Sequence, residues 1–193
     1  MRLLIATHNI GKKREYDELL TGLGYELQTL DEAGVADEIQ ETGGTFEENA
    51  ILKAKGYAAL SGMMTLADDS GLEVDALDGE PGVYSARYGG AGLDDCGRYQ
   101  LVLDKMRLVP QVQRTARFRC VIAVAWPDGR LETASGACEG VIAEEPRGEH
   151  GFGYDPIFYL PHLGQTMAEI DEIVKNQLSH RGKAVAAIKA VLQ

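Results

Sequence analysis

The chain has 193 residues, of which 45% are hydrophobic and 25% are charged, and a formal net charge of −11. This length and composition are typical of a globular protein that buries a sizeable core without disulfides or structural metals. The negative charge would repel a phosphate backbone, and no basic stripe interleaved with aromatic residues occurs, so we expect no nucleic-acid partner.

Hydropathy and cysteine usage indicate in which cellular compartment to expect the protein. No apolar stretch approaches the roughly 20 residues needed to cross a bilayer, and the N-terminal segment turns polar too early for a signal peptide. Three cysteines, Cys96, Cys120 and Cys138, form no CxxC pair, which favours small core residues in a reducing compartment over a disulfide framework. We therefore expect a cytoplasmic protein with no membrane partner.

In chain order, the first elements alternate between strand and helix. The apolar run 3–6 predicts a strand, a polar loop follows at 7–12, and apolar residues recur at helical spacing from Tyr16. A second strand-like run, 25–30, leads into an acidic loop. This order predicts strand, loop, helix and strand.

The next segment carries a clear helix start. Thr45 followed by Glu48 forms a capping box, and the amphipathic run 45–60 predicts a helix. A buried strand is predicted at 63–67, which places the polar segment 68–71 at its carboxyl end. Open α/β sheets bind ligands at such ends, so this segment is a candidate site.

The second half predicts a different arrangement of elements. Glycine and proline crowd 78–92, predicting a loop, and apolar spacing at 99–106 predicts a helix. Two strand-like runs within 115–143 predict an antiparallel hairpin, followed by a loop at 151–156 and a last helix with its apolar stripe at 184–192.

These elements together predict an α/β fold. We expect a single domain, residues 1–193, with two lobes: a mixed sheet flanked by helices, and loops from both lobes lining a central cleft. No internal repeat or low-complexity linker divides the chain.

The loop 7–12 combines a hydroxyl, an amide and a cation, Thr7, Asn9 and Lys12, where a strand meets a helix. Helix N-termini attract phosphate. The loop is not a Walker A motif, because Ala6 replaces the glycine required six residues before the lysine. An N-cap followed by a surface lysine explains this segment equally well.

Two adjacent carboxylates, Asp68 and Asp69, precede a serine and a glycine. Magnesium prefers oxygen ligands. Consecutive side chains in an extended backbone point in opposite directions, so we expect only one of the pair to face a metal, with Glu41 supplying a further ligand. The alternative is a solvated, aspartate-rich turn.

Two later segments could contact a base. The loop 151–156 places Phe152 and Tyr154 among glycines, and aromatic faces stack on bases, although such loops also serve as plain turns. The segment 179–182, with Lys175 before it, offers a histidine and an arginine that could donate to a base carbonyl or a phosphate. Its alternative reading is a serine N-cap followed by solvated charges.

Six motifs taken together resemble, in order and spacing, those of the inosine triphosphate pyrophosphatase family. They are THNIGK at 7–12, ETGGTFEENAILKA at 41–54, ADDSGLEVDAL at 67–77, PGVYSARY at 81–88, GFGYDPIF at 151–158 and SHRGKA at 179–184. The resemblance implies a Mg²⁺-dependent homodimer that hydrolyses dITP, ITP and XTP to the monophosphate and pyrophosphate. Such an enzyme keeps non-standard purines out of DNA and RNA, and the central cleft would bind the nucleotide.

The resemblance also implies roles by position. Asp69 is implied as the catalytic proton acceptor and, with Glu41, as a ligand of Mg²⁺. The substrate-binding residues implied are Thr7, His8, Asn9, Ile10, Gly11, Lys12, Lys53, Ser70, Phe152, Gly153, Tyr154, Asp155, Lys175, His180 and Arg181. Phosphates would lie against 7–12, Lys53 and Ser70. The base would lie on 152–155 and be read by Lys175, His180 and Arg181.

Two other functions compete with this interpretation. A sensing module would bind the same nucleotides without turnover, but binding alone does not require Asp69 with Glu41. A metal-dependent nuclease or phosphodiesterase would need a basic track for its substrate, which the acidic composition disfavours.

Overall fold

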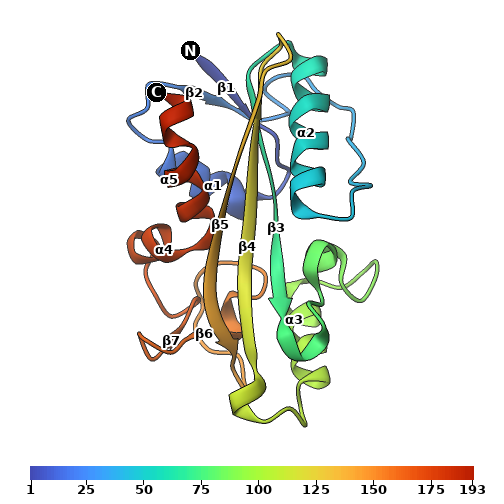
Figure 1. The fold of residues 1–193 in the computed structure, drawn as a ribbon, viewed down its shortest axis with the longest axis vertical. Coiled ribbons are helices and arrows are strands. Elements are labelled where there is room, and N and C mark those ends of the chain that lie inside the picture. The colour runs from blue at the N-terminus through green and yellow to red at the C-terminus, as the bar shows by residue number, and fades with distance from the viewer. The chain divides into compact units, whose positions relative to one another are not determined.

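The computed structural model describes all 193 residues and divides them into two compact units. Unit 1 comprises Met1–Asp69, Cys120–Gly136 and Arg181–Gln193, and unit 2 comprises Ser70–Arg119 and Ala137–His180. Seven strands form a mixed sheet in the order β2-β1-β3-β4-β5-β6-β7, flanked by helices (Figure 1), which confirms the predicted α/β class.

The elements have the following bounds. The strands are β1 (Arg2–Ile5), β2 (Glu26–Gln28), β3 (Thr65–Val74), β4 (Thr115–Ala125), β5 (Leu131–Ile142), β6 (Phe158–Leu160) and β7 (Gln165–Thr166). The α-helices are α1 (Ile10–Leu19), α2 (Phe46–Ser61), α3 (Asp95–Lys105), α4 (Glu172–Leu178) and α5 (His180–Leu192). Short 3-10 helices span Asp75–Leu77, Gly82–Arg87, Gln111–Gln113 and Asp155–Ile157.

Unit 1 begins with parallel strand pairing. β1 pairs with β2 on one side, where Leu3 lies opposite Leu27, and with β3 on the other side, where Ile5 lies opposite Leu66. Because the chain runs from β1 to β2 and then to β3 on the far side of β1, a topological switch point lies between β1 and β3. Open α/β sheets bind ligands beyond the carboxyl ends of strands at such points.

The two faces of the sheet in unit 1 carry different helices. α1 and α5 cover one face, and α2 lies on the other side (Figure 1). The core under α1 and α5 combines strand residues Leu3, Ile5, Leu66, Cys120, Ile122 and Val124 with helix residues Tyr16, Leu20, Ala184, Val185, Ile188 and Leu192. Since side chains alternate along a strand, residues in phase with Leu66 point toward α1 and α5.

The start of α2 confirms the predicted capping box, with one variation. The hydroxyl of Thr45 accepts a hydrogen bond from the backbone N–H of Glu48 at 3.1 Å. The Glu48 carboxylate accepts from the N–H of Gly44 at 2.7 Å, one residue before the N-cap N–H that the motif usually uses. The helix ends at Gly62, whose φ of 66° is the left-handed conformation that glycine adopts readily.

The strand predicted at 63–67 proves too short. β3 continues to Val74 and includes both Asp68 and Asp69, which are buried. The sequence suggested a polar segment at the strand end because a carboxylate is costly to bury without a partner. The structure supplies such partners, so the alternative of a solvated turn is also wrong.

Unit 2 contains antiparallel strand pairs, and the two strand-like runs predicted within 115–143 form β4 and β5, which are neighbours in the sheet. Val141 of β5 lies opposite Tyr159 of β6, which in turn lies opposite Thr166 of β7. β6, β7 and α4 were not predicted, because elements of two to seven residues are too short for periodicity to show. The predicted loop 78–92 contains the 3-10 helix Gly82–Arg87.

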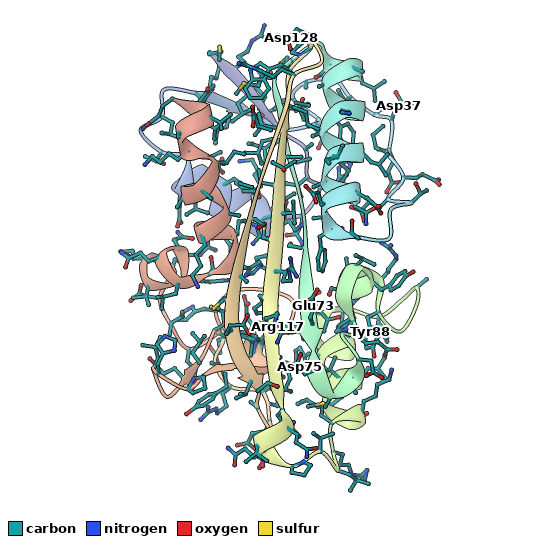
Figure 2. The ribbon with its side chains drawn as sticks, viewed as in Figure 1. Asp37, Glu73, Asp75, Tyr88, Arg117 and Asp128 are labelled. Atoms are coloured by element: carbon teal, nitrogen blue, oxygen red, sulfur yellow. The ribbon has the colours of Figure 1, made fainter.

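An exposed ion network joins three strands of unit 2. Arg117 of β4 donates to both carboxylate oxygens of Asp75, at 2.8 and 3.0 Å. It also pairs with Glu139 of β5 at 3.2 Å. Arg117 lies 3.9 Å from Glu73 of β3, and Figure 2 shows Glu73, Asp75 and Arg117 in the same part of the sheet. Opposite charges on neighbouring strands stabilise the sheet modestly.

A buried arginine closes the end of α3. The Arg114 guanidinium donates to the carbonyl oxygens of Met106 at 2.7 Å, Ile142 at 2.8 Å and Ala143 at 2.8 Å. Helix ends leave carbonyls without intrahelical partners, and the guanidinium satisfies one here while joining α3 to the end of β5.

The three cysteines differ in their burial. Cys120 and Cys138 are buried as expected, but Cys96 is exposed, so the prediction that all three are core residues is wrong. Cys96 lies in the first turn of α3, whose buried residues fall later in the helix. None of the helices has the length and apolar character that spanning a bilayer requires.

Candidate active site

The loop after β1 and the middle of β3 meet where the switch point predicts. β1 ends at Ile5, opposite Leu66, so Asp68 and Asp69 lie just beyond the end of β1. The ammonium of Lys12, in the first turn of α1, pairs with the Asp68 carboxylate at 2.9 Å. Cationic and anionic groups from two motifs of the sequence therefore belong to one site.

The loop itself is held by local hydrogen bonds. Asn9 is the N-cap of α1, and its side chain accepts from the N–H of Lys12 at 2.9 Å. The Thr7 hydroxyl accepts from the N–H of Asn9 at 3.1 Å. The N-cap alternative is thus correct for Asn9, but Lys12 is not a surface lysine, since its side chain is only 15% exposed. Gly11 belongs to the same helical turn, and such a turn favours bound anions.

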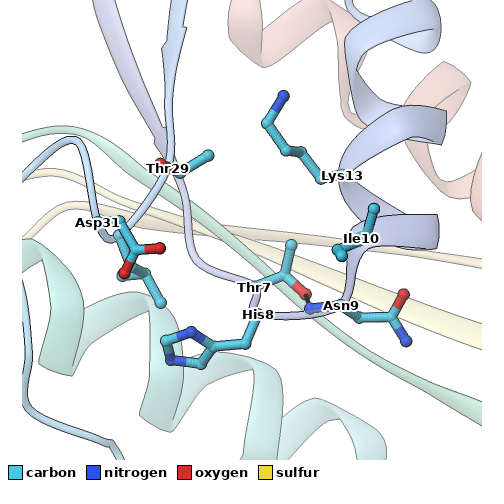
Figure 3. Close-up of a pocket in the computed structure, with 8 residues that line it drawn as sticks. Thr7, His8, Asn9, Ile10, Lys13, Thr29 and Asp31 are labelled. Atoms are coloured by element: carbon cyan, nitrogen blue, oxygen red, sulfur yellow. Dashed lines mark hydrogen bonds between the residues drawn. The ribbon is translucent and has the colours of Figure 1, made fainter.

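A pocket of about 140 Å³ borders this loop on the side of β2. It is lined by Thr7, His8, Asn9, Ile10, Lys13, Thr29, Leu30 and Asp31. Figure 3 shows His8 and Asp31 on one side, with Ile10 and Lys13 of α1 on the other. The predicted substrate loop therefore adjoins open space.

Asp68 is the centre of a buried ion cluster. Besides Lys12, its carboxylate pairs with the guanidinium of Arg181 at 3.3 Å, and Arg181 also pairs with Glu15 of α1. Burial alone would raise the pKa of Asp68, but the charges of Lys12 and Arg181 hold that pKa far below its usual range. Asp68 is thus a fixed anion at neutral pH, and Arg181, 1% exposed, is one of its cations.

Asp69 points to the opposite face of β3. Its carboxylate accepts a hydrogen bond from the side-chain amide of Asn49, on α2, at 3.0 Å. Burial raises the pKa of Asp69 above its ordinary value, although the charge of Lys53 opposes this. Two adjacent carboxylates therefore have pKa values shifted in opposite directions, a pattern that separates a proton acceptor from a fixed charge.

Lys53 connects the acidic loop to β3. Its ammonium pairs with the carboxylate of Glu41 and donates to the carbonyl oxygen of Asp68 at 2.7 Å. Burial alone would lower the pKa of Lys53, but the charges of Asp68 and Asp69 raise it. Lys53 therefore stays a cation and cannot serve as a base.

The donor set of this site suits magnesium. No three His, Cys, Asp or Glu side chains gather closely enough to enclose a metal ion. Mg²⁺ is, however, usually bound through one or two carboxylates together with substrate phosphates and waters. Glu41 and Asp69, whose charges influence each other, are two such carboxylates.

A second group of predicted residues lies in unit 2. The Asp155 carboxylate accepts from the N–H of Phe152 at 2.9 Å and from the Lys175 ammonium at 2.6 Å. That ammonium lies 4.9 Å from the centroid of the Phe152 ring. His180 stacks on Phe118 with ring centroids 4.9 Å apart. Lys175, Asp155 and His180 are buried, whereas Phe152 is partly exposed.

The remaining residues of the predicted base loop are held by hydrogen bonds to other parts of unit 2. Tyr154 belongs to the core of unit 2, and its hydroxyl donates to the carbonyl oxygen of Ser85 at 2.8 Å. The N–H of Gly153 donates to the carboxylate of Asp95 at 2.8 Å. Of the two aromatic rings, therefore, only that of Phe152 has a face that could stack on a base. Ser70, predicted on the phosphate side, follows directly after Asp69 on β3 and is partly exposed.

Sequence reasoning missed the residues that support these groups. Asn49 and Glu15 contact site residues in unit 1, and Ser85 and Asp95 hold the base loop in unit 2. One signal was available for Asn49, because it lies three residues after Phe46 on the apolar side of α2, where a polar residue needs a partner.

The geometry of the site indicates a class of protein. Paired carboxylates and lysines beside a helix N-terminus, at the switch point of a parallel sheet, are typical of α/β proteins that bind phosphorylated ligands. A family model described as the Ham1 family matches residues 3–191, and the chain belongs to this family.

Individual relatives cover nearly the whole chain. A dITP/XTP pyrophosphatase of Desulforamulus reducens is 53% identical over 192 residues, which cover 100% of this chain and 96% of the relative. One of Bacillus subtilis is 50% identical over 190 residues, covering 98% and 96%. A solved Ham1 protein from Coxiella burnetii, 43% identical, superposes with a TM-score of 0.90 and coverage of 100% and 98%. These findings confirm the resemblance inferred from the six motifs.

Proposed function

We propose that this protein is a nucleoside triphosphate pyrophosphatase that hydrolyses dITP, ITP and XTP to the monophosphate and pyrophosphate. The observation that carries the proposal is the pair of buried carboxylates Asp68 and Asp69, which face opposite sides of β3 beside Lys12 and Lys53. Relatives about half identical to this chain are named dITP/XTP pyrophosphatases, which supports the same substrates here.

The phosphates bind to the residues of unit 1. The ammonium groups of Lys12 and Lys53 are held in place by carboxylates, so they offer positive charge to a polyphosphate without first being ordered. The first turn of α1, preceded by Thr7–Asn9, adds backbone N–H groups that favour anions. Ser70 contributes a hydroxyl next to the reacting phosphate.

Asp69 takes the proton from the attacking water. Burial raises the pKa of Asp69, whereas the charges of Lys12 and Arg181 lower that of Asp68, so Asp69 is the better proton acceptor of the two. Glu41 and Asp69 hold Mg²⁺, which supplies charge neutralisation on the phosphate oxygens and a lower pKa for water. The positive charge of Lys53, which pairs with Glu41, reduces the repulsion between the carboxylates of Glu41 and Asp69.

The residues proposed to bind the purine lie in unit 2. The partly exposed Phe152 ring offers a stacking face, and the Lys175 ammonium beside it is a donor only. A keto oxygen at purine position 6 accepts a hydrogen bond from such a donor. Adenine carries an amino group at that position, which is itself a donor, so adenine nucleotides would be rejected. His180 takes part in the recognition of the base, whereas Arg181, in unit 1, is engaged with Asp68 and Glu15.

The proposal includes a cellular setting and an oligomeric state. The protein acts in the cytoplasm as a homodimer and removes deaminated purines from the nucleotide pool, which keeps them out of DNA and RNA. Size-exclusion chromatography with light scattering measures the dimer: a molar mass near twice 20.9 kDa supports it, and the monomer mass contradicts it.

Release of pyrophosphate tests the activity. Purified protein with Mg²⁺ is incubated with dITP, ITP, XTP, dATP and dGTP, and pyrophosphate is measured. We expect release from the first three at rates at least tenfold above those from dATP, and loss of release when EDTA removes the metal. Tight binding of ITP without any pyrophosphate would support a sensing module instead.

A further inference from the structure

Asn49 is a fully buried polar residue on α2, with 0% of its surface exposed. Its side-chain NH₂ donates to the Asp69 carboxylate at 3.0 Å, and its side-chain carbonyl oxygen accepts from the N–H of Gly43 at 2.8 Å. A buried amide is costly unless both of its ends have partners. Both ends of Asn49 have one, in two different segments of unit 1.

The orientation of the Asn49 amide is fixed by these partners. The backbone N–H of Gly43 can only donate, so the amide oxygen must face it, and the NH₂ must then face the Asp69 carboxylate. Gly43 also has to be a glycine for this contact, because a Cβ there would lie 2.7 Å from the Asn49 oxygen and 2.6 Å from Cβ of Glu48.

Asn49 and Lys53 form one bridging face of α2. They are four residues apart and thus neighbours on the helix surface. Both contact β3, Asn49 through the Asp69 carboxylate and Lys53 through the Asp68 carbonyl oxygen. Both also hold the acidic loop, Asn49 through Gly43 and Lys53 through Glu41. The face therefore ties the loop that carries Glu41 to the strand that carries Asp69.

We propose that Asn49 is a positioning residue for Asp69, fixing the rotamer of the carboxylate relative to the acidic loop. It acts through Asp69, because both ends of its amide are engaged by groups of the protein itself. Its effect on turnover rests on the proposed function of Asp69, whereas the hydrogen bond itself does not. The loss of such supporting contacts commonly lowers activity 10–100-fold.

Asn49→Asp tests the contact selectively. The new carboxylate keeps an acceptor for the N–H of Gly43 but places an oxygen against the Asp69 carboxylate. We expect kcat for dITP to fall about 10–100-fold, with KM changed less than about threefold because no substrate contact is lost. Asn49→Ser removes the donor without adding charge, and a similar fall in kcat is expected.

Gln100→Glu is the matched control. Gln100 donates to Asp104 at 3.1 Å on the exposed surface of α3, so the change is the same amide-to-carboxylate exchange facing an aspartate. This variant should keep kcat and KM within about twofold of the parent, as exposed surface changes usually do. If folded Asn49→Asp and Asn49→Ser both keep the parent's kcat, the proposal is overturned.

A donor–acceptor exchange tests the hydrogen bond without reference to catalysis. Asn49→Asp combined with Asp69→Asn restores one donor facing one carboxylate in the same place. We expect this double variant to recover most of the loss in urea midpoint caused by Asn49→Asp alone, while turnover stays absent. A double variant no more stable than Asn49→Asp would overturn the contact. If the parent protein releases no pyrophosphate but the exchange restores stability, the proposed function fails and the contact between Asn49 and Asp69 stands.

Discussion

Neutralising Asp68 should destabilise the protein strongly without changing its shape. Asp68→Asn keeps the side-chain volume but removes the anion that faces Lys12 and Arg181. Removing one partner of a buried ion pair costs about 3–5 kcal/mol, because the remaining charge is left buried. For a chain of this length each kcal/mol lowers Tm by about 2–4 °C, so we expect a loss of roughly 6–20 °C.

The assay compares urea unfolding and calorimetric Tm of the parent and the variant at neutral pH. Asp17→Asn serves as the control, because Asp17 pairs with Lys13 at 2.6 Å with both side chains about two-fifths exposed. An exposed pair four residues apart on a helix contributes only about 0.3–0.5 kcal/mol. If the two variants are equally stable, the conclusion that the buried Asp68 carboxylate stabilises the fold through its ion pairs is refuted.

The pH dependence of this difference has a definite sign. The pKa of Asp68 in the folded protein lies below the value of about 3.9 in an unfolded chain. The stabilisation is therefore complete at neutral pH and is lost only as the pH falls toward the folded-state pKa. The gap between parent and variant should stay constant from about pH 8 to pH 5 and shrink below about pH 4. A gap that widens on acidification would contradict the ion cluster.

Three further changes probe other parts of the structure. Asp69→Asn should lower pyrophosphate release from dITP by about 10²–10⁴-fold, while calorimetric titration still shows nucleotide binding; near-parental turnover would rule out Asp69 as the proton acceptor. Arg114→Met leaves buried carbonyl oxygens without a donor and should cost about 2–4 kcal/mol in urea unfolding; an unchanged midpoint would show that the guanidinium is dispensable. Gly151→Ala puts a Cβ 2.0 Å from the Asp155 carboxylate and should raise KM for dITP, whereas Gly22→Ala, which has a similar φ but open space around it, should leave KM unchanged.

The sequence predicted those parts of the fold that depend on local patterns. The capping box at Thr45 located the start of α2, and apolar spacing found α1 and α5, because both signals lie within a few neighbouring residues. The continuation of β3 through Asp68 and Asp69 could not be predicted this way. Whether a carboxylate can be buried depends on partners far along the chain.

The same reason limits what the sequence says about the site. Six motifs were enough to recognise the family and to select its polar residues, but not to pair them. Glu15 and Arg181 are 166 positions apart, yet their side chains form one ion pair. Asn49 was visible inside a motif, but its link to Asp69 exists only once α2 packs beside β3.

The alternation along β3 has a consequence for protein engineering. Asp68 and Asp69 differ in chemistry because the pleat sends one toward α1 and α5 and its neighbour toward α2. Deleting or inserting a single residue before them would turn each carboxylate to the opposite face of the sheet and so remove both from their present partners. Anyone grafting this pair into another scaffold needs a strand with a helix on both sides, since a flexible loop cannot keep adjacent carboxylates apart.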